Sequence, residues 1–211
     1  MTDKHLQSRR WASVARRLVG AVIVALSLLF IYRALRFFSF SPEVLGKYFP
    51  FKWVIMGHIA GGLLALLAGP LQLSRTFRGK YRRAHRVIGR VYISAVVIGA
   101  VCALILASTT ALVVGWAYAL SLHMLASVWG VSALLAWRTA VRRRFKQHEE
   151  WADRSYIATV AFVAQSMSFE IPWIAGLGSF AEVSTTIIWM SWTVPMFVYD
   201  CLRGSRQRAA Q

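Results

Sequence analysis

Residues 52–73 read KWVIMGHIAGGLLALLAGPLQL, a stretch whose only charged side chain is its first. An α-helix of about 20 apolar residues crosses the hydrocarbon core of a bilayer. The stretch therefore predicts a membrane-spanning helix. It also holds an imidazole, His58, in surroundings where a polar ring is costly and usually has a role.

The composition of the whole chain also indicates a membrane protein. Hydrophobic residues make up 57% of the 211 positions and charged residues only 16%, which is more apolar than an ordinary soluble domain. Comparable apolar stretches lie at 18–38, 88–108, 111–137, 155–175 and 182–202. We therefore expect an all-α fold, a single domain over residues 1–211 that forms a bundle of six transmembrane helices, with short basic tails at about 1–17 and 203–211.

The basic residues that give the chain its net charge of +17 are distributed along it as the expected topology requires. Most of the 25 Lys and Arg residues lie before the first span, between the second and third, between the fourth and fifth, and after the sixth. The positive-inside rule assigns such segments to the cytoplasm, so both termini are predicted to be cytoplasmic. Topology and contact with anionic lipid headgroups explain these basic runs, and we expect no nucleic-acid partner.

Motifs of soluble enzymes are absent from the sequence. It has no Walker loop, dinucleotide-binding glycine fingerprint, nucleophile elbow or HExxH zinc motif. Cys102 and Cys201 lie in separate apolar stretches and are interpreted as small hydrophobic residues. Glu170, near the outer end of the fifth span, is interpreted as reaching the interface, with a proton or ion path as the alternative.

Four histidines fall one to each of the four central spans. His58 and His123 are expected about 9 and 18 Å below the outer face, whereas His85 and His148 lie at the cytoplasmic ends of their spans. Imidazole is a common ligand of haem iron and other metals, so these pairs are candidate ligand sites at two heights. The alternatives are a hydrogen bond between helices for the first pair, and a solvated or phosphate-contacting ring for the second.

Small residues accompany the two histidines inside the membrane at helical spacing. Gly61, Gly62, Ala65 and Gly69 share a helix face with His58, and Ala119, Ala126, Ser127 and Gly130 share one with His123. Such faces allow either close packing of helices or the approach of a flat macrocycle. The spacing alone does not choose between them.

Three motifs carry a resemblance to a known family. They are the run from His58 through Gly69-Pro70-Leu71-Gln72, the segment His85-Arg86-x-x-Gly89-Arg90-x-Tyr92, and the segment His148-x-x-Trp151-x-x-Arg154-Ser155-Tyr156. Over roughly residues 50–160 the chain resembles the bacterial membrane proteins grouped as domain of unknown function family 2306. The resemblance implies a multi-pass protein of the bacterial inner membrane and implies no reaction.

The placement of the histidines is more distantly similar to the six-helix dihaem transmembrane b-type cytochromes of the ascorbate- and ferric-reductase type. This resemblance implies electron transfer through one or two haem b groups and an oxidoreductase with a quinone or ferric substrate or another redox partner. The alternative is a haem-free membrane module that binds a partner protein, a lipid or a small solute between its helices. The implied ligands are His58 with His123 for the outer iron and His85 with His148 for the cytoplasmic iron, with Gly62, Gly69, Gly89 and Arg86 beside the cofactor.

Overall fold

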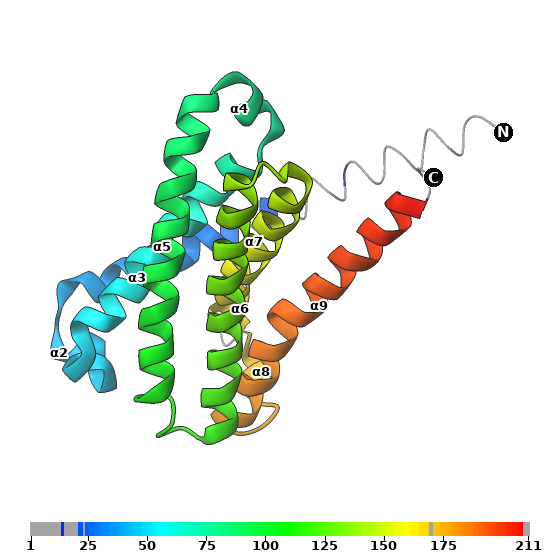
Figure 1. The fold of residues 1–211 in the computed structure, drawn as a ribbon. Helices are drawn as coiled ribbons and strands as arrows, with labels where there is room; N and C mark the ends of the chain where they lie inside the picture. Colours follow the sequence, from blue (N-terminus) through cyan, green and yellow to red (C-terminus); the bar gives the residue numbers. More distant parts are fainter. Residues whose placement is uncertain (1–13, 15–20, 23, 169–170, 209–211) are drawn as a thin grey trace.

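The computed structural model describes residues 14, 21–22, 24–168 and 171–208, and every regular element among them is helical (Figure 1). The predicted all-α class is therefore confirmed for these residues. A first helix covers residues 24–35. It is followed by η1 (Arg36–Ser39), α2 (Pro42–Leu45), η2 (Gly46–Phe51), α3 (Lys52–Leu73), α4 (Arg75–Lys80), α5 (Arg82–Ser108), α6 (Trp116–Val141), α7 (Phe145–Ser168), α8 (Pro172–Ala175) and α9 (Phe180–Arg208).

Among the described residues, three helical segments are long and apolar enough to cross a membrane. They are Pro42–Leu73, α5 and α6, and they correspond to the second, third and fourth predicted spans. Helix α7 begins with a charged segment, and α9 has several Ser and Thr residues among its apolar ones, so both are less hydrophobic along their length. Both of these helices nevertheless pack against α6 and against each other.

The helix boundaries differ from the sequence prediction at the charged ends. Helix α3 has the predicted bounds, but α5 begins at Arg82 rather than at residue 88, and α7 begins at Phe145 rather than at residue 155. Arg, Lys, Gln and Glu favour helix, so these segments continue the helices beyond their apolar parts. His85 and His148 consequently lie inside helices.

The predicted fifth span is interrupted near its far end. Helix α7 ends at Ser168, and a new short helix, α8, begins with a proline, Pro172, at its first position. Proline is favoured at the first position of a helix because the backbone N–H that it lacks would have no hydrogen-bond partner within the helix. Glu170 and most of the predicted basic tail over 1–17 lie outside the described residues.

A tight turn between α5 and α6 shortens the fourth predicted span. The Ala111 N–H donates to the Leu106 carbonyl at 3.1 Å, and Gly115 precedes α6 with a φ of 154°. Glycine adopts positive φ without a steric penalty, so α6 begins at Trp116 and not at residue 111. His123 thus lies about two turns into α6, closer to the end of its helix than predicted.

Helices α3 and α5 cross at a contact between glycines. A Cβ atom on Gly61 would lie 2.5 Å from the Ala95 carbonyl oxygen and 3.0 Å from the Gly99 Cα. On the other side of α5, a Cβ on Gly99 would lie 2.8 Å from the ring of Trp129, which is fully buried. At Gly61 the small-residue face of α3 therefore serves close helix packing, the first of the two alternatives.

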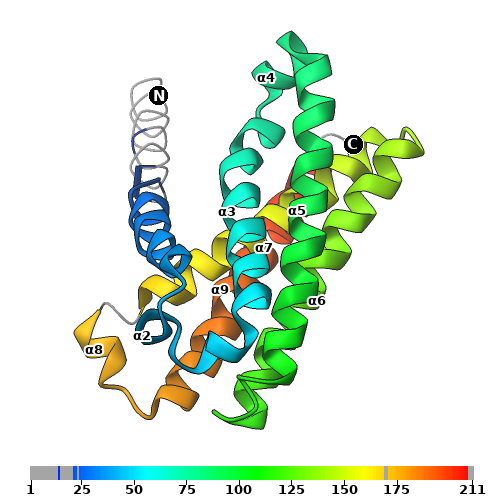
Figure 2. The same cartoon turned by 90° about the vertical axis from the view of Figure 1, so that its left-hand side faces the viewer.

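The segments that connect the long helices lie at two opposite ends of the molecule (Figures 1 and 2). The basic end holds α4, the start of α5, the end of α6 and the start of α7, within residues 75–90 and 138–154. The turn end holds α2, the α5–α6 turn and α8. Helix α9 is inclined to the other long helices (Figure 1).

Candidate functional site

His58 is held in one orientation between α3, α5 and its aromatic neighbours. Its Nδ1 lies 3.0 Å from the Gly99 carbonyl oxygen, which accepts only, so Nδ1 carries the donated hydrogen. The ring meets Trp129 and Phe162 edge to face, with centroid distances of 6.3 and 5.4 Å. The other ring nitrogen, Nε2, takes no part in the hydrogen bond to Gly99.

A cavity of about 400 Å³ lies beside His58 and extends towards the turn end. We call it the turn-end cavity. Its walls come from the first helix, η1, η2, α3, the end of α5, the start of α6, the end of α7 and the start of α9, and most of its lining is apolar or aromatic. The polar or charged lining residues are Arg33, Arg36, Tyr48, His58, Thr110, Tyr118, Gln165 and Ser166. A mainly apolar cavity with a few convergent polar groups is the usual form of a small-molecule site.

His123 has protein partners for both of its ring nitrogens. Nε2 lies 2.8 Å from Ser108 Oγ, and Nδ1 lies 2.7 Å from the Ala119 carbonyl oxygen. On α5, His58 contacts Gly99 and His123 contacts Ser108. These two α5 residues are nine positions apart, or about 14 Å along the helix axis. The structure therefore does not bring these two imidazoles onto one iron. Along α5, the contact of His58 lies farther from the α5–α6 turn than the contact of His123.

His85 and His148 lie close enough at the basic end to interact electrostatically. Nδ1 of His148 donates to the Ala136 carbonyl at 2.8 Å, while Nδ1 of His85 is buried and has no hydrogen-bond partner among the described residues. His148 lines a cavity of about 40 Å³ together with Gly69, Gly89 and their neighbours. That volume suits a water molecule and is far below the size of a macrocycle.

The other residues predicted beside a macrocycle do not line a larger space. A Cβ on Gly69 would collide with the ring of Tyr156, and one on Gly89 would lie 2.9 Å from Gln72 Oε1. Gly62 has nothing within 4 Å of such an atom, and Arg86 is exposed. As packed, the cavity beside His148 is too small for a haem. In the described part of the chain, no three His, Cys, Asp or Glu side chains converge on a metal site.

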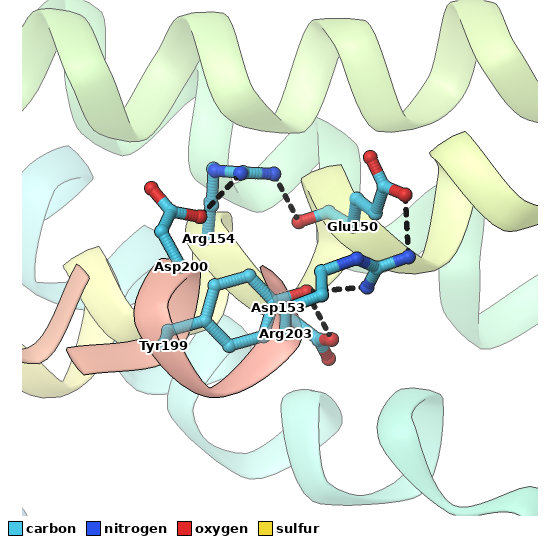
Figure 3. A network of polar contacts seen from close by, with 6 residues as sticks. All are labelled: Glu150, Asp153, Arg154, Tyr199, Asp200 and Arg203. Atoms are coloured by element: carbon cyan, nitrogen blue, oxygen red, sulfur yellow. Dashed lines mark hydrogen bonds and ion pairs between the residues drawn. The ribbon is translucent and has the colours of Figure 1, made fainter. Parts of the chain in front are cut away.

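The third sequence motif contributes to an ionic cluster between α7 and α9, shown in Figure 3. Arg154 donates to Asp200 Oδ1 at 2.6 Å, and Arg203 pairs with Glu150. Arg203 also donates to the Tyr199 hydroxyl at 2.8 Å, and that hydroxyl donates to Asp153 Oδ2 at 2.8 Å. Asp153 precedes the predicted fifth span, and burial raises the pKa of its carboxyl group. The α7–α9 ionic cluster consists of Glu150, Asp153, Arg154, Tyr199, Asp200 and Arg203.

Two spatial arrangements in the interior could not be predicted from the sequence. The first is the set of aromatic walls of the turn-end cavity, which come from helices far apart in the chain. The second is a buried hydrogen-bond chain: the Tyr92 hydroxyl lies 2.9 Å from Ser155 Oγ, and Trp129 Nε1 donates to Thr159 Oγ1 at 2.8 Å. Tyr92 and Ser155 belong to two of the quoted motifs, so this part of the motifs serves helix packing.

A protein-family comparison agrees with the motifs and extends them. The family model described as "Predicted membrane protein (DUF2306)" matches residues 55–202. The match begins in α3 and reaches into α9, well beyond the end of the motif-bearing region near residue 160. No curated protein and no solved structure matches the chain.

Proposed function

Because the chain belongs to the DUF2306 family of predicted membrane proteins, we propose that it crosses the bacterial inner membrane six times with both termini in the cytoplasm. The basic residues at 75–90 and 138–154 support this orientation through the positive-inside rule. Anionic lipid headgroups are then the natural partners of the basic end. The turn-end cavity lies in the outer half of the bilayer, and its function is to bind a small amphipathic molecule.

The turn-end cavity is the observation that carries the binding proposal. Its volume of about 400 Å³ falls within the range of small-molecule sites, roughly 300 to 1,000 Å³. The apolar walls suit the hydrocarbon part of a ligand, while His58, Arg33 and Arg36 supply polar contacts for a head group. A molecule with both parts partitions into the membrane and reaches the cavity from there.

Filling the cavity tests the proposal directly. Ala103→Phe adds a ring to a residue that lines the cavity, whereas Ile105→Phe adds one to an exposed position on the same helix. We expect native mass spectrometry to detect bound amphiphile on the wild type and on Ile105→Phe, and at least about ten-fold less on Ala103→Phe. Circular dichroism should show the same helix content in all three. Equal occupancy in the two variants would exclude the cavity as the binding site.

Electron transfer through haem b is the second hypothesis, and it rests on the resemblance to dihaem cytochromes. One kind of contact is consistent with it at both ends of the molecule: His58, His123 and His148 each donate to a backbone carbonyl through Nδ1, as metal-bound histidines commonly do. The small cavity beside His148 opposes it at the basic end. The reduced-minus-oxidised absorption spectrum of detergent-purified protein distinguishes the two hypotheses. A b-type alpha band that His148→Ala abolishes supports haem, and a colourless, fully inserted preparation excludes it.

A further inference from the structure

We propose that the ligand of the turn-end cavity is a hydroquinone, whose ring hydroxyl donates a hydrogen bond to Nε2 of His58. This inference rests on the proposed binding function and specifies the chemical class of the ligand. It follows from the hydrogen-bonding state of His58, from the rigidity of its ring and from the composition of the cavity walls.

The hydrogen-bonding state of His58 determines what its free nitrogen accepts. The Gly99 carbonyl can only accept, so Nδ1 of His58 carries a hydrogen. A charged imidazolium is costly this far from water, so the second nitrogen, Nε2, is left with a lone pair. His58 lines the cavity and therefore offers a hydrogen-bond acceptor to its occupant. A ligand with a donor, such as a hydroxyl group, satisfies it, whereas a ketone, an ether or a carboxylate does not.

The position of this acceptor is set before a ligand enters. The ring of His58 is nearly perpendicular to Trp129, at 85°, and is inclined by 69° to Phe162. Trp129 and Phe162 also contact each other at a centroid distance of 5.1 Å, and Trp129 is held by its hydrogen bond to Thr159. A fixed acceptor reduces the ordering cost of binding and makes the site selective for a ligand of matching geometry.

The walls of the cavity favour a flat ring over a simple alkyl chain. Aromatic side chains reach it from six elements, the first helix, η1, η2, α6, α7 and α9, and such side chains interact specifically with another aromatic ring. A hydroquinone also has a second hydroxyl on the opposite side of its ring. Tyr48, Gln165 and Arg36 line the same cavity and can serve that second oxygen. The aromatic residues are Phe30, Phe37, Tyr48, Tyr118, Phe162 and Phe180.

The test compares a ligand that has the donor with a matched ligand that lacks it. The probes are a decyl-substituted dimethoxy-methyl hydroquinone, kept reduced under anaerobic conditions, and its 1,4-dimethyl ether. Each is titrated calorimetrically into the full chain in lipid nanodiscs, with empty nanodiscs as the blank. We expect the wild type to bind the hydroquinone at least about ten-fold more tightly than the ether, the value of roughly one buried hydrogen bond.

Two variants test whether His58 accepts the hydrogen bond from the ligand's hydroxyl group. His58→Leu should lower the preference for the hydroquinone over the ether by about ten-fold, because it removes the partner of the first hydroxyl and leaves those of the second. His123→Leu, which removes an imidazole that does not line the cavity, should leave the preference unchanged. Equal wild-type affinity for the two probes would overturn the assignment without any variant, so the test holds even if His58→Leu does not fold.

The outcomes separate this inference from the broader proposal. Equal wild-type affinity for the two probes would overturn the hydroquinone assignment. Binding of neither probe would overturn it too. In both cases the proposal of amphiphile binding stands if Ala103→Phe still loses its bound amphiphile. A preference that His58→Leu does not reduce would overturn it as well. Unchanged amphiphile occupancy in Ala103→Phe would instead reject the cavity itself.

Discussion

At the residue scale, two adjacent glycines of α3 have opposite surroundings. A Cβ on Gly61 would press against the backbone of α5, 2.5 Å from the Ala95 carbonyl oxygen, whereas a Cβ on Gly62 would have nothing within 4 Å. The backbone of α5 cannot move aside as the end of a flexible side chain can. Gly61 is therefore required by helix packing, while Gly62 only weakens the helix as glycine generally does.

The two alanine variants should consequently change stability in opposite directions. We expect Gly61→Ala to lower the free energy of unfolding by about 1 to 3 kcal/mol through overpacking. Gly62→Ala should raise it by up to about 1 kcal/mol through higher helix propensity. Denaturant unfolding in detergent, followed by circular dichroism, measures both values. A Gly61→Ala variant as stable as the wild type would contradict the close approach of α3 and α5.

At the scale of elements, charged contacts attach α7 to its neighbours at the basic end. The Glu150–Arg203 pair joins α7 to α9, with each side chain 24% exposed, and it shares Arg203 with the Tyr199 hydroxyl (Figure 3). The Arg78–Glu149 pair joins α4 to α7 at 2.6 Å, with side chains 34% and 37% exposed. The first pair is less accessible to water and belongs to a network, so its interaction is screened less.

A double-mutant cycle compares the strength of these two contacts. For Glu150→Gln with Arg203→Gln we expect a coupling energy of about 1 to 3 kcal/mol in the free energy of unfolding. For Arg78→Gln with Glu149→Gln we expect about 0.2 to 1 kcal/mol, as for exposed ion pairs. Raising the salt concentration should weaken the second coupling more than the first. The reverse order of coupling energies would show that the α7–α9 ionic cluster does not hold α9.

At the scale of the whole molecule, the proposed orientation predicts which segments reach the periplasm. Alkaline phosphatase is active only outside the cytoplasm, so fusions report the side on which each segment lies. We expect activity from a fusion after Gly178, between α8 and α9 at the turn end, and no activity from fusions after Gly79 or Gln211. An active fusion after Gly79, within the basic end, would reverse the orientation and place the turn-end cavity in the inner leaflet.

Sequence reasoning succeeded for features that depend on local composition. It located α3 at its observed bounds, because a bilayer-length apolar run next to charged residues defines a span by itself. It also singled out His58 as a candidate, because a polar ring among apolar residues stands out; the structure places this ring against Gly99 and beside the turn-end cavity. It misplaced the start of α6 and hence His123, since the turn before Gly115 lies within residues as apolar as the helix.

Local composition was sufficient to predict helices of membrane-spanning length, since helical periodicity and hydrophobicity act over a few turns of one segment. Which histidines lie near one another, and where a cavity forms, could be read only from the folded chain. Those facts depend on how helices cross, and the crossing is set by contacts such as Gly61 against Gly99, which involve segments distant in the chain. The α3–α5 crossing places His58 opposite Gly99, and the packing of α6 on α5 places His123 opposite Ser108. The turn-end cavity beside His58 forms where these helices meet the first helix, α7 and α9.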